Sequence, residues 1–315
     1  MKPTSHKSRA GASAVSAGTD TSEPATVVEC FGRRAIVQTA DRRIAASVFG
    51  KRTSIVCGDQ VRVGTPANSD ELQVLEVMPR RTSFSRTDSR GRIEVLAANL
   101  DLLAVVFAPE PEPDLYIVDR YLAGAAYASL DALIVFNKSD LGVSDWLEDY
   151  RRAGYTTLEI SAKEDTGLEA LRAGVNGKKI LLAGQSGVGK STLANALVPQ
   201  SQRPTRELSS SSGEGRHTTV SSAWFDMPNN GALIDSPGVR DYAPPPLTDD
   251  KVQVGWSEIL ALAPSCRFNN CLHLREPGCA VLKALDDESI SQRRYDSYRR
   301  LLNLMRQLAP SHERF

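Results

Sequence analysis

The sequence lacks the features of membrane and secreted proteins. No apolar run approaches the ~20 residues needed to cross a bilayer, and the first 25 residues lack the apolar stretch of a secretory signal. The five cysteines are an odd number, which does not suit a disulfide scaffold. We therefore expect a soluble, cytoplasmic chain with no membrane association, whose cysteines are free or bound to a metal.

Excess charge of either sign is also missing. The chain has 38 basic and 38 acidic side chains, which excludes a protein that grips nucleic acid or anionic lipid over its whole surface. The net charge differs between regions of the chain. Residues 1–90 carry 14 basic and 9 acidic side chains, whereas residues 91–245 carry 14 basic and 20 acidic side chains. A local basic surface near the N-terminus therefore remains possible.

The 315 residues are enough for two or three domains. We expect a disordered tail at 1–25, where Ser, Thr, Ala and Gly predominate. Short Val- and Ile-rich segments at 26–90 suit a small β-barrel or sandwich. At 91–245, apolar strands alternate with helix-like segments, which predicts a multidomain α/β chain with a mostly parallel sheet covered by helices on both faces. Residues 246–315 are predicted to be helical apart from a Cys/His cluster.

A phosphate-binding loop is predicted by GQSGVGKS, which matches G-x-x-x-x-G-K-[ST] between a strand-like and a helix-like segment. Its backbone N–H groups surround the phosphates, Lys190 reaches the β- and γ-phosphates and takes part in catalysis, and Ser191 binds Mg²⁺. The predicted nucleotide contacts of this loop are Gly184, Gln185, Ser186, Gly187, Val188, Gly189, Lys190, Ser191 and Thr192.

Two segments indicate that the nucleotide is GTP. In NKSD, the carboxylate of Asp140 can accept hydrogen bonds from the N1–H and N2 amine of guanine, which adenine cannot offer. In SAK, the Ala162 N–H could meet the guanine O6. Each segment alone could be an ordinary loop, but together they predict guanine contacts by Asn137, Lys138, Ser139, Asp140, Ser161, Ala162 and Lys163.

A γ-phosphate sensor is predicted at DSPG, where Asp235 would hold Mg²⁺ through water and the Gly238 N–H would meet the γ-phosphate. The polar segment 209–220 precedes it, and Thr218 or Thr219 could complete the Mg²⁺ shell when GTP is bound, with Thr219 our choice. Usual GTPases begin with the phosphate loop, whereas here the base-reading segments come first. The order therefore indicates a circularly permuted domain.

Cys266, Cys271, His273 and Cys279 supply three thiolates and an imidazole within fourteen residues. This soft set suits one structural Zn²⁺ in a closed tetrahedral site. The alternative is free buried cysteines beside a surface histidine.

The permuted order, with a β-rich region before it and a Cys/His cluster after it, resembles the ribosome-small-subunit-dependent GTPase A family (RsgA, also called YjeQ). The motifs NKSD, SAK, GQSGVGKST, GRHTT, DSPG and CRFNNCLHLREPGC carry the resemblance, from about Val27 to the C-terminus. It implies an N-terminal OB-fold barrel that binds RNA, a circularly permuted P-loop GTPase domain and a C-terminal helical zinc-binding domain. It further implies a cytoplasmic monomer that acts in late maturation of the small ribosomal subunit, contacts its rRNA, and hydrolyses GTP slowly until the subunit stimulates it.

The residue that orients the attacking water is not where many GTPases place it. A Gln often follows D-x-x-G, but here that residue is Val239, which cannot orient water. We predict that His217, in the segment 209–220, takes this role when a partner docks. Arg216 beside it could act on the phosphates instead, and a solvated loop histidine is the simpler alternative.

Positive charge in the β-rich region and in the basic connector PRRTSFSRTDSRGR (79–92) that follows its strands suits RNA phosphate contacts, although a basic solvated surface is the alternative. The residues are Arg33, Arg34, Arg42, Arg43, Lys51, Arg52, Arg80, Arg81, Arg86 and Arg90. Near the C-terminus an apolar helical stripe (Tyr298, Leu301, Leu302, Met305, Leu308) is predicted opposite a basic outer face (Arg293, Arg299, Arg300, Arg306). A second interpretation of the whole chain is an RNA-binding module in which GTP is mainly a structural ligand.

Overall fold

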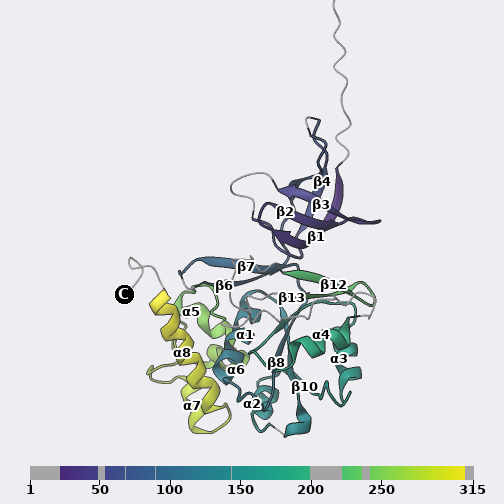
Figure 1. The fold of residues 1–315 in the computed structure, drawn as a ribbon. Coiled ribbons are helices and arrows are strands. Elements are labelled where there is room, and N and C mark those ends of the chain that lie inside the picture. The colour runs from purple at the N-terminus through teal and green to yellow at the C-terminus, as the bar shows by residue number, and fades with distance from the viewer. Residues whose placement is uncertain are drawn as a thin grey trace, which may run out of the picture.

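The computed structural model contains an N-terminal barrel, a central sheet flanked by helices and a C-terminal group of helices (Figure 1). The structure describes residues 22–48, 54–67, 69–88, 90–142, 144–198, 222–235 and 242–308.

Five strands form a closed barrel, which confirms the predicted β-barrel. They are β1 (Glu23–Phe31), β2 (Arg34–Gln38), β3 (Arg43–Val48), β4 (Gln60–Gly64) and β5 (Gln73–Val77), in the order β1-β2-β3-β5-β4, and β1 closes the barrel on β4. Alternate side chains such as Val27, Val37 and Val61 fill the interior, as the period of two along a strand requires.

The start of the barrel differs from expectation. β1 begins at Glu23, inside the stretch predicted as a tail, because Glu23 to Thr26 pair with β4; residues 1–21 lie outside the described part of the chain. β3 lies between β2 and β5 in the barrel, although its sequence RIAASV has few residues that favour strands.

A two-stranded hairpin links the barrel to the central sheet. β6 (Ser83–Thr87) and β7 (Ile93–Ala98) pair antiparallel, so part of the expected basic connector is a strand. Phe84 of β6 is fully buried and stacks on Tyr242 at 4.9 Å between ring centroids. The hairpin spans the boundary predicted at residue 90 and packs on the larger core.

The central sheet has the predicted α/β architecture. β8 (Leu102–Phe107), β9 (Asp131–Phe136), β10 (Thr156–Glu159), β11 (Lys179–Ala183) and β13 (Gly231–Asp235) are parallel, and β12 (Ala223–Met227) pairs antiparallel with β13. The order is β10-β9-β8-β11-β13-β12. β11, which carries the phosphate loop, is therefore central.

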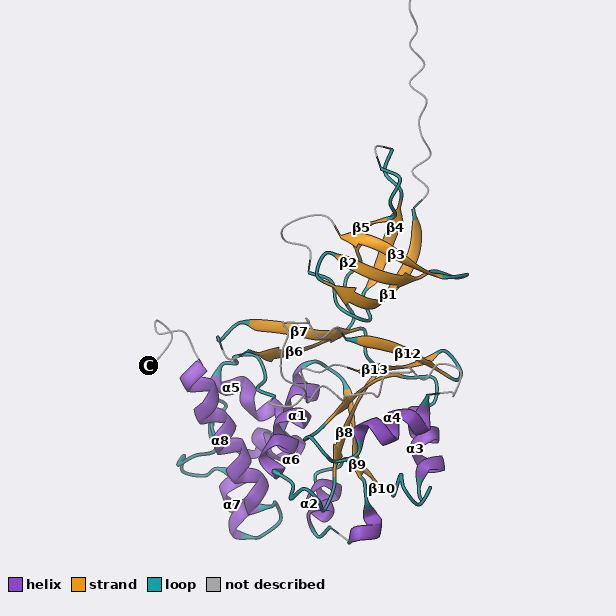
Figure 2. Ribbon diagram, viewed as in Figure 1, coloured by secondary structure: helices purple, strands orange, loops and turns teal. Residues whose placement is uncertain are grey.

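Helices cover both faces of this sheet, as predicted (Figure 2). Leu103, Val105 and Phe107 of β8 share one core with α1 (Leu115–Tyr127) and α2 (Trp146–Arg152). Leu102, Ala104 and Val106 point to the other face and pack with α3 (Leu168–Val175) and α4 (Lys190–Leu197). Near-continuous apolar strands are typical of a parallel sheet buried on both sides.

The C-terminal region packs four helices around Trp256 and Tyr298. They are α5 (Asp249–Val252), α6 (Ser257–Leu262), α7 (Ala280–Asp286) and α8 (Gln292–Leu308). The predicted stripe of α8 lies in this core, with Leu308 at its margin. The predicted basic outer face is wrong for Arg293, which pairs with Asp119 and Asp149 of the central region. No helix in the described ranges is long and apolar enough for a membrane span.

Candidate functional site

The topology brings the predicted nucleotide-binding segments to one edge of the sheet. NKSD follows β9, SAK follows β10, the phosphate loop follows β11, and Asp235 ends β13. Because these strands are parallel, their carboxyl ends meet at the same edge, where open α/β sheets bind ligands. Segments separated by up to about a hundred residues therefore form one site.

The phosphate loop has a backbone that only glycine tolerates at two points. Gly184 has φ of 143°, and a Cβ there would lie 2.1 Å from the Val106 carbonyl oxygen. Gly189 has φ of 93°, and its Cβ would lie 2.2 Å from Nδ2 of Asn137. Both glycines are needed because the loop passes tightly against neighbouring segments.

Side chains suited to a phosphate and a cation meet at the start of α4. Lys190 donates through Nζ to the Gly184 carbonyl at 2.7 Å and also to the Gln185 carbonyl. Lys190, Ser191 and Asp235 line one small pocket. A hydroxyl and a carboxylate are oxygen ligands of the kind that Mg²⁺ prefers, so the donors fit a phosphate-bound Mg²⁺.

Asn137 connects the phosphate loop to the base-reading segments. Its buried side chain donates through Nδ2 to the Val188 carbonyl at 2.8 Å, and its Oδ1 accepts from the Ala162 N–H at 3.1 Å. The Ala162 amide, predicted to meet a guanine O6, thus bonds within the protein in this structure. One side chain fixes the spacing between the two halves of the site.

Asp140 is oriented by Ser161, whose hydroxyl donates to Oδ1 at 2.6 Å. This hydrogen bond holds the pKa of Asp140 below its usual value, so the carboxylate stays ionised and can act as a double acceptor. Lys138 adopts φ of 60° and donates to the Glu110 carbonyl at 2.8 Å.

The remaining predicted contacts are spread over the loop, a short turn and α4. Ser139 begins a short 3-10 turn, and Lys163 is exposed beside Glu164. Ser186 and Gly187 of the loop and Thr192 of α4 are exposed. His217, Arg216, Thr218, Thr219 and Gly238 lie outside the described residues.

Sequence reasoning missed the contact between the phosphate loop and α1. Oε1 of Gln185 accepts from the Asp114 backbone N–H at 3.0 Å. Asp114 also caps α1, because its Oδ1 accepts from the N–H groups of Tyr116 and Ile117. An acidic residue before an apolar helix is a recognisable N-cap signal, but its link to Gln185 is visible only in the fold.

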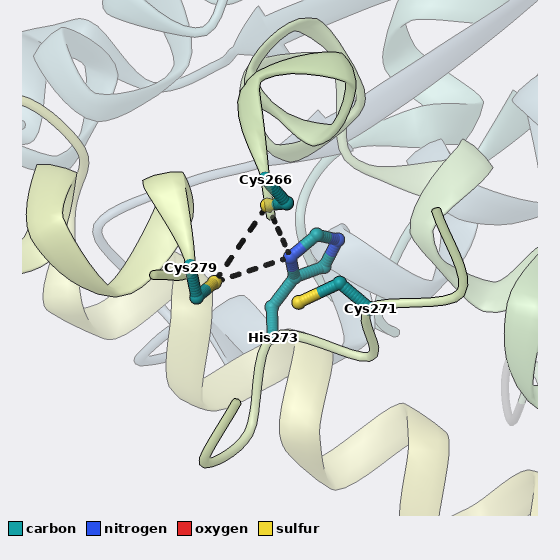
Figure 3. Close-up of side chains that lie close together, drawn as sticks. All are labelled: Cys266, Cys271, His273 and Cys279. Carbon is teal, nitrogen blue, oxygen red and sulfur yellow. Dashed lines mark hydrogen bonds between the residues drawn. The ribbon is translucent and has the colours of Figure 1, made fainter. Parts of the chain in front are cut away.

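Four metal-ligating side chains converge in the C-terminal region, as predicted (Figure 3). Their donor atoms all lie within 4.8 Å of one another. Nδ1 of His273 is 3.5 Å from Sγ of Cys266 and 3.4 Å from Sγ of Cys279, and these two sulfurs are 3.9 Å apart. The cluster can therefore hold one metal ion among Cys266, Cys271, His273 and Cys279.

A hydrogen bond to Gln253 and burial set the protonation states of these ligands. Gln253 accepts from Nε2 of His273 at 2.9 Å, which leaves Nδ1 with its lone pair toward the sulfurs. Burial lowers the pKa of His273 and raises that of Cys271 to about 12. The imidazole is therefore neutral, and the thiol needs a cation to become a thiolate at neutral pH. Gln253 lies twenty residues from His273 and was missed in the sequence.

The loop between the ligands is held by Glu276 and Tyr295. Burial opposes ionisation of Glu276, but backbone N–H groups of Arg275, Leu272 and Leu274 donate to its carboxylate and lower its pKa to about 2. The Tyr295 hydroxyl donates to the His273 carbonyl at 2.6 Å.

A buried ion-pair cluster joins the C-terminal region to α1 and was not predicted. Asp119 Oδ1 accepts from Nη1 of Arg294 at 2.7 Å, and Oδ2 accepts from Nη1 of Arg293 at 2.8 Å. Arg294 also binds both carboxylate oxygens of Glu258, and Arg293 pairs with Asp149. The side chains of Asp119 and Arg294 are 0% and 1% exposed.

The predicted basic surface of the barrel and connector is smaller than expected. Arg80 forms a two-pronged pair with the fully buried Asp59 and is structural. Arg43, Arg81 and Arg86 also pair with carboxylates. Of the residues predicted for this surface, Arg33, Arg34, Arg42 and Arg90 are exposed and have no carboxylate partner in the described part of the chain. Lys51 and Arg52 lie outside the described ranges.

The fold and the site together define a circularly permuted P-loop GTPase with a barrel before it and a Cys₃His cluster after it. Residues 77–243 match the family model described as RsgA GTPase. The small ribosomal subunit biogenesis GTPase RsgA of Pseudomonas fluorescens is 40% identical over 288 residues, covering 88% of this chain and 84% of that protein. RsgA of Pseudomonas aeruginosa is 39% identical over 89% of this chain and 84% of its own length.

Two solved structures have the same fold as this chain. The crystal structure of YjeQ from Thermotoga maritima superposes with a TM-score of 0.71 at 26% identity, covering 90% of this chain and 98% of that chain. YloQ, a circularly permuted GTPase, has the same fold, with a TM-score of 0.68 over 92% of this chain and 96% of its own at 23% identity. The chain belongs to the RsgA GTPase family.

Proposed function

We propose that this protein hydrolyses GTP and acts in the late maturation of the small ribosomal subunit, which stimulates the hydrolysis. The convergence of the phosphate loop, Asp140 and Asp235 at one sheet edge carries the proposal. Membership of the RsgA family, whose curated relatives are named for small-subunit biogenesis, supplies the partner.

The residues divide between base, phosphates and metal. Guanine is bound by Asn137, Lys138, Ser139, Asp140, Ser161, Ala162 and Lys163, with the Asp140 carboxylate as the selective acceptor. The loop from Gly184 to Thr192 surrounds the phosphates, and α4 presents its N-terminus to them. Ser191, Asp235 and Thr219 would hold Mg²⁺, which shields the phosphate charge when bound.

Hydrolysis needs a water placed in line with the γ-phosphate. Val239 cannot orient it, so His217 takes that role, while Lys190 stabilises charge on the phosphates and Gly238 senses the γ-phosphate. The test is single-turnover hydrolysis by His217→Ala with small subunits present. A large loss of rate supports the role of His217, and an unchanged rate removes it.

The metal of the Cys₃His cluster is one structural Zn²⁺. Bond lengths of about 2.3 Å to sulfur and 2.0 Å to nitrogen put tetrahedral ligands about 3.8 Å apart for two sulfurs and about 3.5 Å for sulfur and nitrogen. The observed separations are 3.9 Å between the sulfurs of Cys266 and Cys279, and 3.5 and 3.4 Å from those sulfurs to His273 Nδ1. Four protein ligands leave no open position, so the ion stabilises the loop.

The remaining partners follow from the ribosomal role. The exposed arginines of the barrel contact rRNA phosphates, and the protein works as a monomer in the cytoplasm, where ribosomes mature. The positive charge fixes position without reading sequence.

The decisive measurement is GTP turnover with and without small subunits. Lys190→Ala removes the phosphate-contacting ammonium and is expected to lower the stimulated rate about 10²–10³-fold. Lys283→Ala, an exposed lysine on α7, is the matched control and keeps the wild-type rate. Bound GTP without stimulation by the subunit would favour the alternative in which GTP is a structural ligand of an RNA-binding module.

A further inference from the structure

Two arginines from different regions stack on one tyrosine at the joint between α1 and α8. The guanidinium carbon of Arg300, on α8, lies 4.0 Å from the ring centroid of Tyr116, and that of Arg120, on α1, lies 5.0 Å from it. Arg300 is exposed, and Tyr116 and Arg120 are half-buried. Two like charges are thus held near one ring where α8 packs along α1 (Figure 1).

The nearby carboxylates in the described ranges are engaged elsewhere and do not neutralise this pair. Both oxygens of Asp119 are bound to Arg293 and Arg294. Asp114 is occupied in capping α1.

On α8, Asp296 stands one turn before Arg300 but pairs with Arg299 instead. In the described part of the chain, no carboxylate lies within ion-pair distance of Arg120 or Arg300, and Nε of Arg120 is buried without a hydrogen-bond partner. Because clustered cations attract a counter-charge, the arrangement suits an external anion.

We propose that Tyr116, Arg120 and Arg300 form a binding site for the phosphodiester backbone of RNA. Guanidinium groups bind phosphate oxygens through paired N–H donors, and a stacked tyrosine fixes their planes. Arginine and tyrosine are also common contacts to nucleic-acid phosphates. The inference rests on the proposed function, which supplies small-subunit RNA as the source of the phosphate.

The position of this cluster gives the contact a consequence for the nucleotide site. Tyr116 lies in the first turn of α1, and the residue that caps this helix, Asp114, is bonded to Gln185 of the phosphate loop. RNA bound here would contact the GTPase region and the metal-bearing region together.

The test is the affinity for purified small subunits as a function of KCl concentration, with wild type, Arg120→Gln/Arg300→Gln and the control Arg299→Gln. Arg299 is the neighbouring exposed arginine but already has Asp296 as a partner. We expect the double variant to bind about tenfold more weakly at low salt and to reduce the slope of log K against log[KCl] by about 1 to 2. Arg299→Gln should keep the wild-type slope. Equal slopes for the double variant and the control would overturn the proposal.

Two further experiments identify the ligand. A photoreactive benzophenone side chain in place of Asn303, one turn after Arg300 on α8, should crosslink to rRNA; crosslinks only to a ribosomal protein would overturn the assignment. Thermal stabilisation by inorganic phosphate that requires both arginines, with subunit binding unchanged, would mean a free-anion site and also overturn it.

Failure of this site and failure of the proposed function give different results. If wild type does not bind subunits, the proposed function fails; if wild type binds and both variants bind equally, only this site fails. If the double variant melts early, the single variant Arg300→Gln replaces it, because Arg300 is exposed and has no ion pair with any residue that the structure describes.

Discussion

Replacing Arg294 by methionine should strongly destabilise the joint between the GTPase and C-terminal regions. Arg294 is 1% exposed and makes three charge-assisted hydrogen bonds, one to Asp119 at 2.7 Å and two to Glu258 at 2.6 and 2.9 Å. At about 1.5 kcal/mol each, these bonds sum to about 4–5 kcal/mol. The value agrees with the roughly 3–5 kcal/mol lost when one partner of a buried pair is removed.

The assay is equilibrium denaturation in urea, followed by tryptophan fluorescence, with zinc kept saturating. Trp256 lies in the C-terminal core and Trp224 on β12, so both regions contribute to the signal. Loss of the joint should lower the unfolding free energy of the C-terminal region by the amount above and separate its transition from that of the sheet. A second substitution, Asp119→Asn, tests coupling by a double-mutant cycle.

Arg299→Met is the matched control, because its pair with Asp296 is 3.8 Å long and both side chains are about half exposed. Such a surface pair contributes about 0–1 kcal/mol. A loss below 1 kcal/mol for Arg294→Met, or a loss equal to that of the control, would refute the reasoning that this cluster joins the two regions.

Three further outcomes are expected. The hydrogen bond from Ser161 lowers the pKa of Asp140, and the ionised carboxylate binds guanine. In Ser161→Ala, GTP affinity should therefore begin to fall at a higher pH than in wild type as the pH is lowered. Titrations with a fluorescent GTP analogue between pH 4 and 7 measure this, and superimposable pH profiles would contradict it. Gly189→Ala places a methyl group 2.2 Å from Nδ2 of Asn137 at φ of 93°. Calorimetry should therefore detect no nucleotide binding, while the barrel stays folded. Retained binding would mean that the loop can shift. Gln253→Leu removes the acceptor of the ligand histidine, so competition with a chelator should show about 10- to 100-fold weaker zinc binding, whereas unchanged affinity would exclude that orienting role.

The phosphate loop and the base-reading segments could be predicted because their chemistry is local. Gly184 and Gly189 are dictated by backbone shape, and Asp140 follows a strand whose apolar run is plain in the sequence. Parallel strands then bring such segments to one edge without further information. The same holds for Cys266 and its partner ligands, which are close in sequence.

Other parts depend on contacts that no local pattern records. β6 reads as a basic connector because SFSRT is mostly polar, and only the buried Phe84 stacked on Tyr242, 158 residues later, makes it part of the core. The sequence predicts Arg293 on the basic outer face of α8, but the residue pairs with Asp119, 174 residues earlier. The sequence predicts that Arg80 contacts RNA, but its guanidinium is bound to the carboxylate of Asp59. Long-range pairing decides each case.

The barrel also protects an exposed edge of the central sheet. β12 is the last strand of that sheet, and β1 pairs with it through Glu29 and Ala223, while Arg43 of β3 binds Asp226 at 2.7 Å. Unpaired edge strands are templates for intermolecular pairing. A fragment trimmed of its first eighty residues would leave β12 open to self-association, so the barrel also acts as a shield against aggregation.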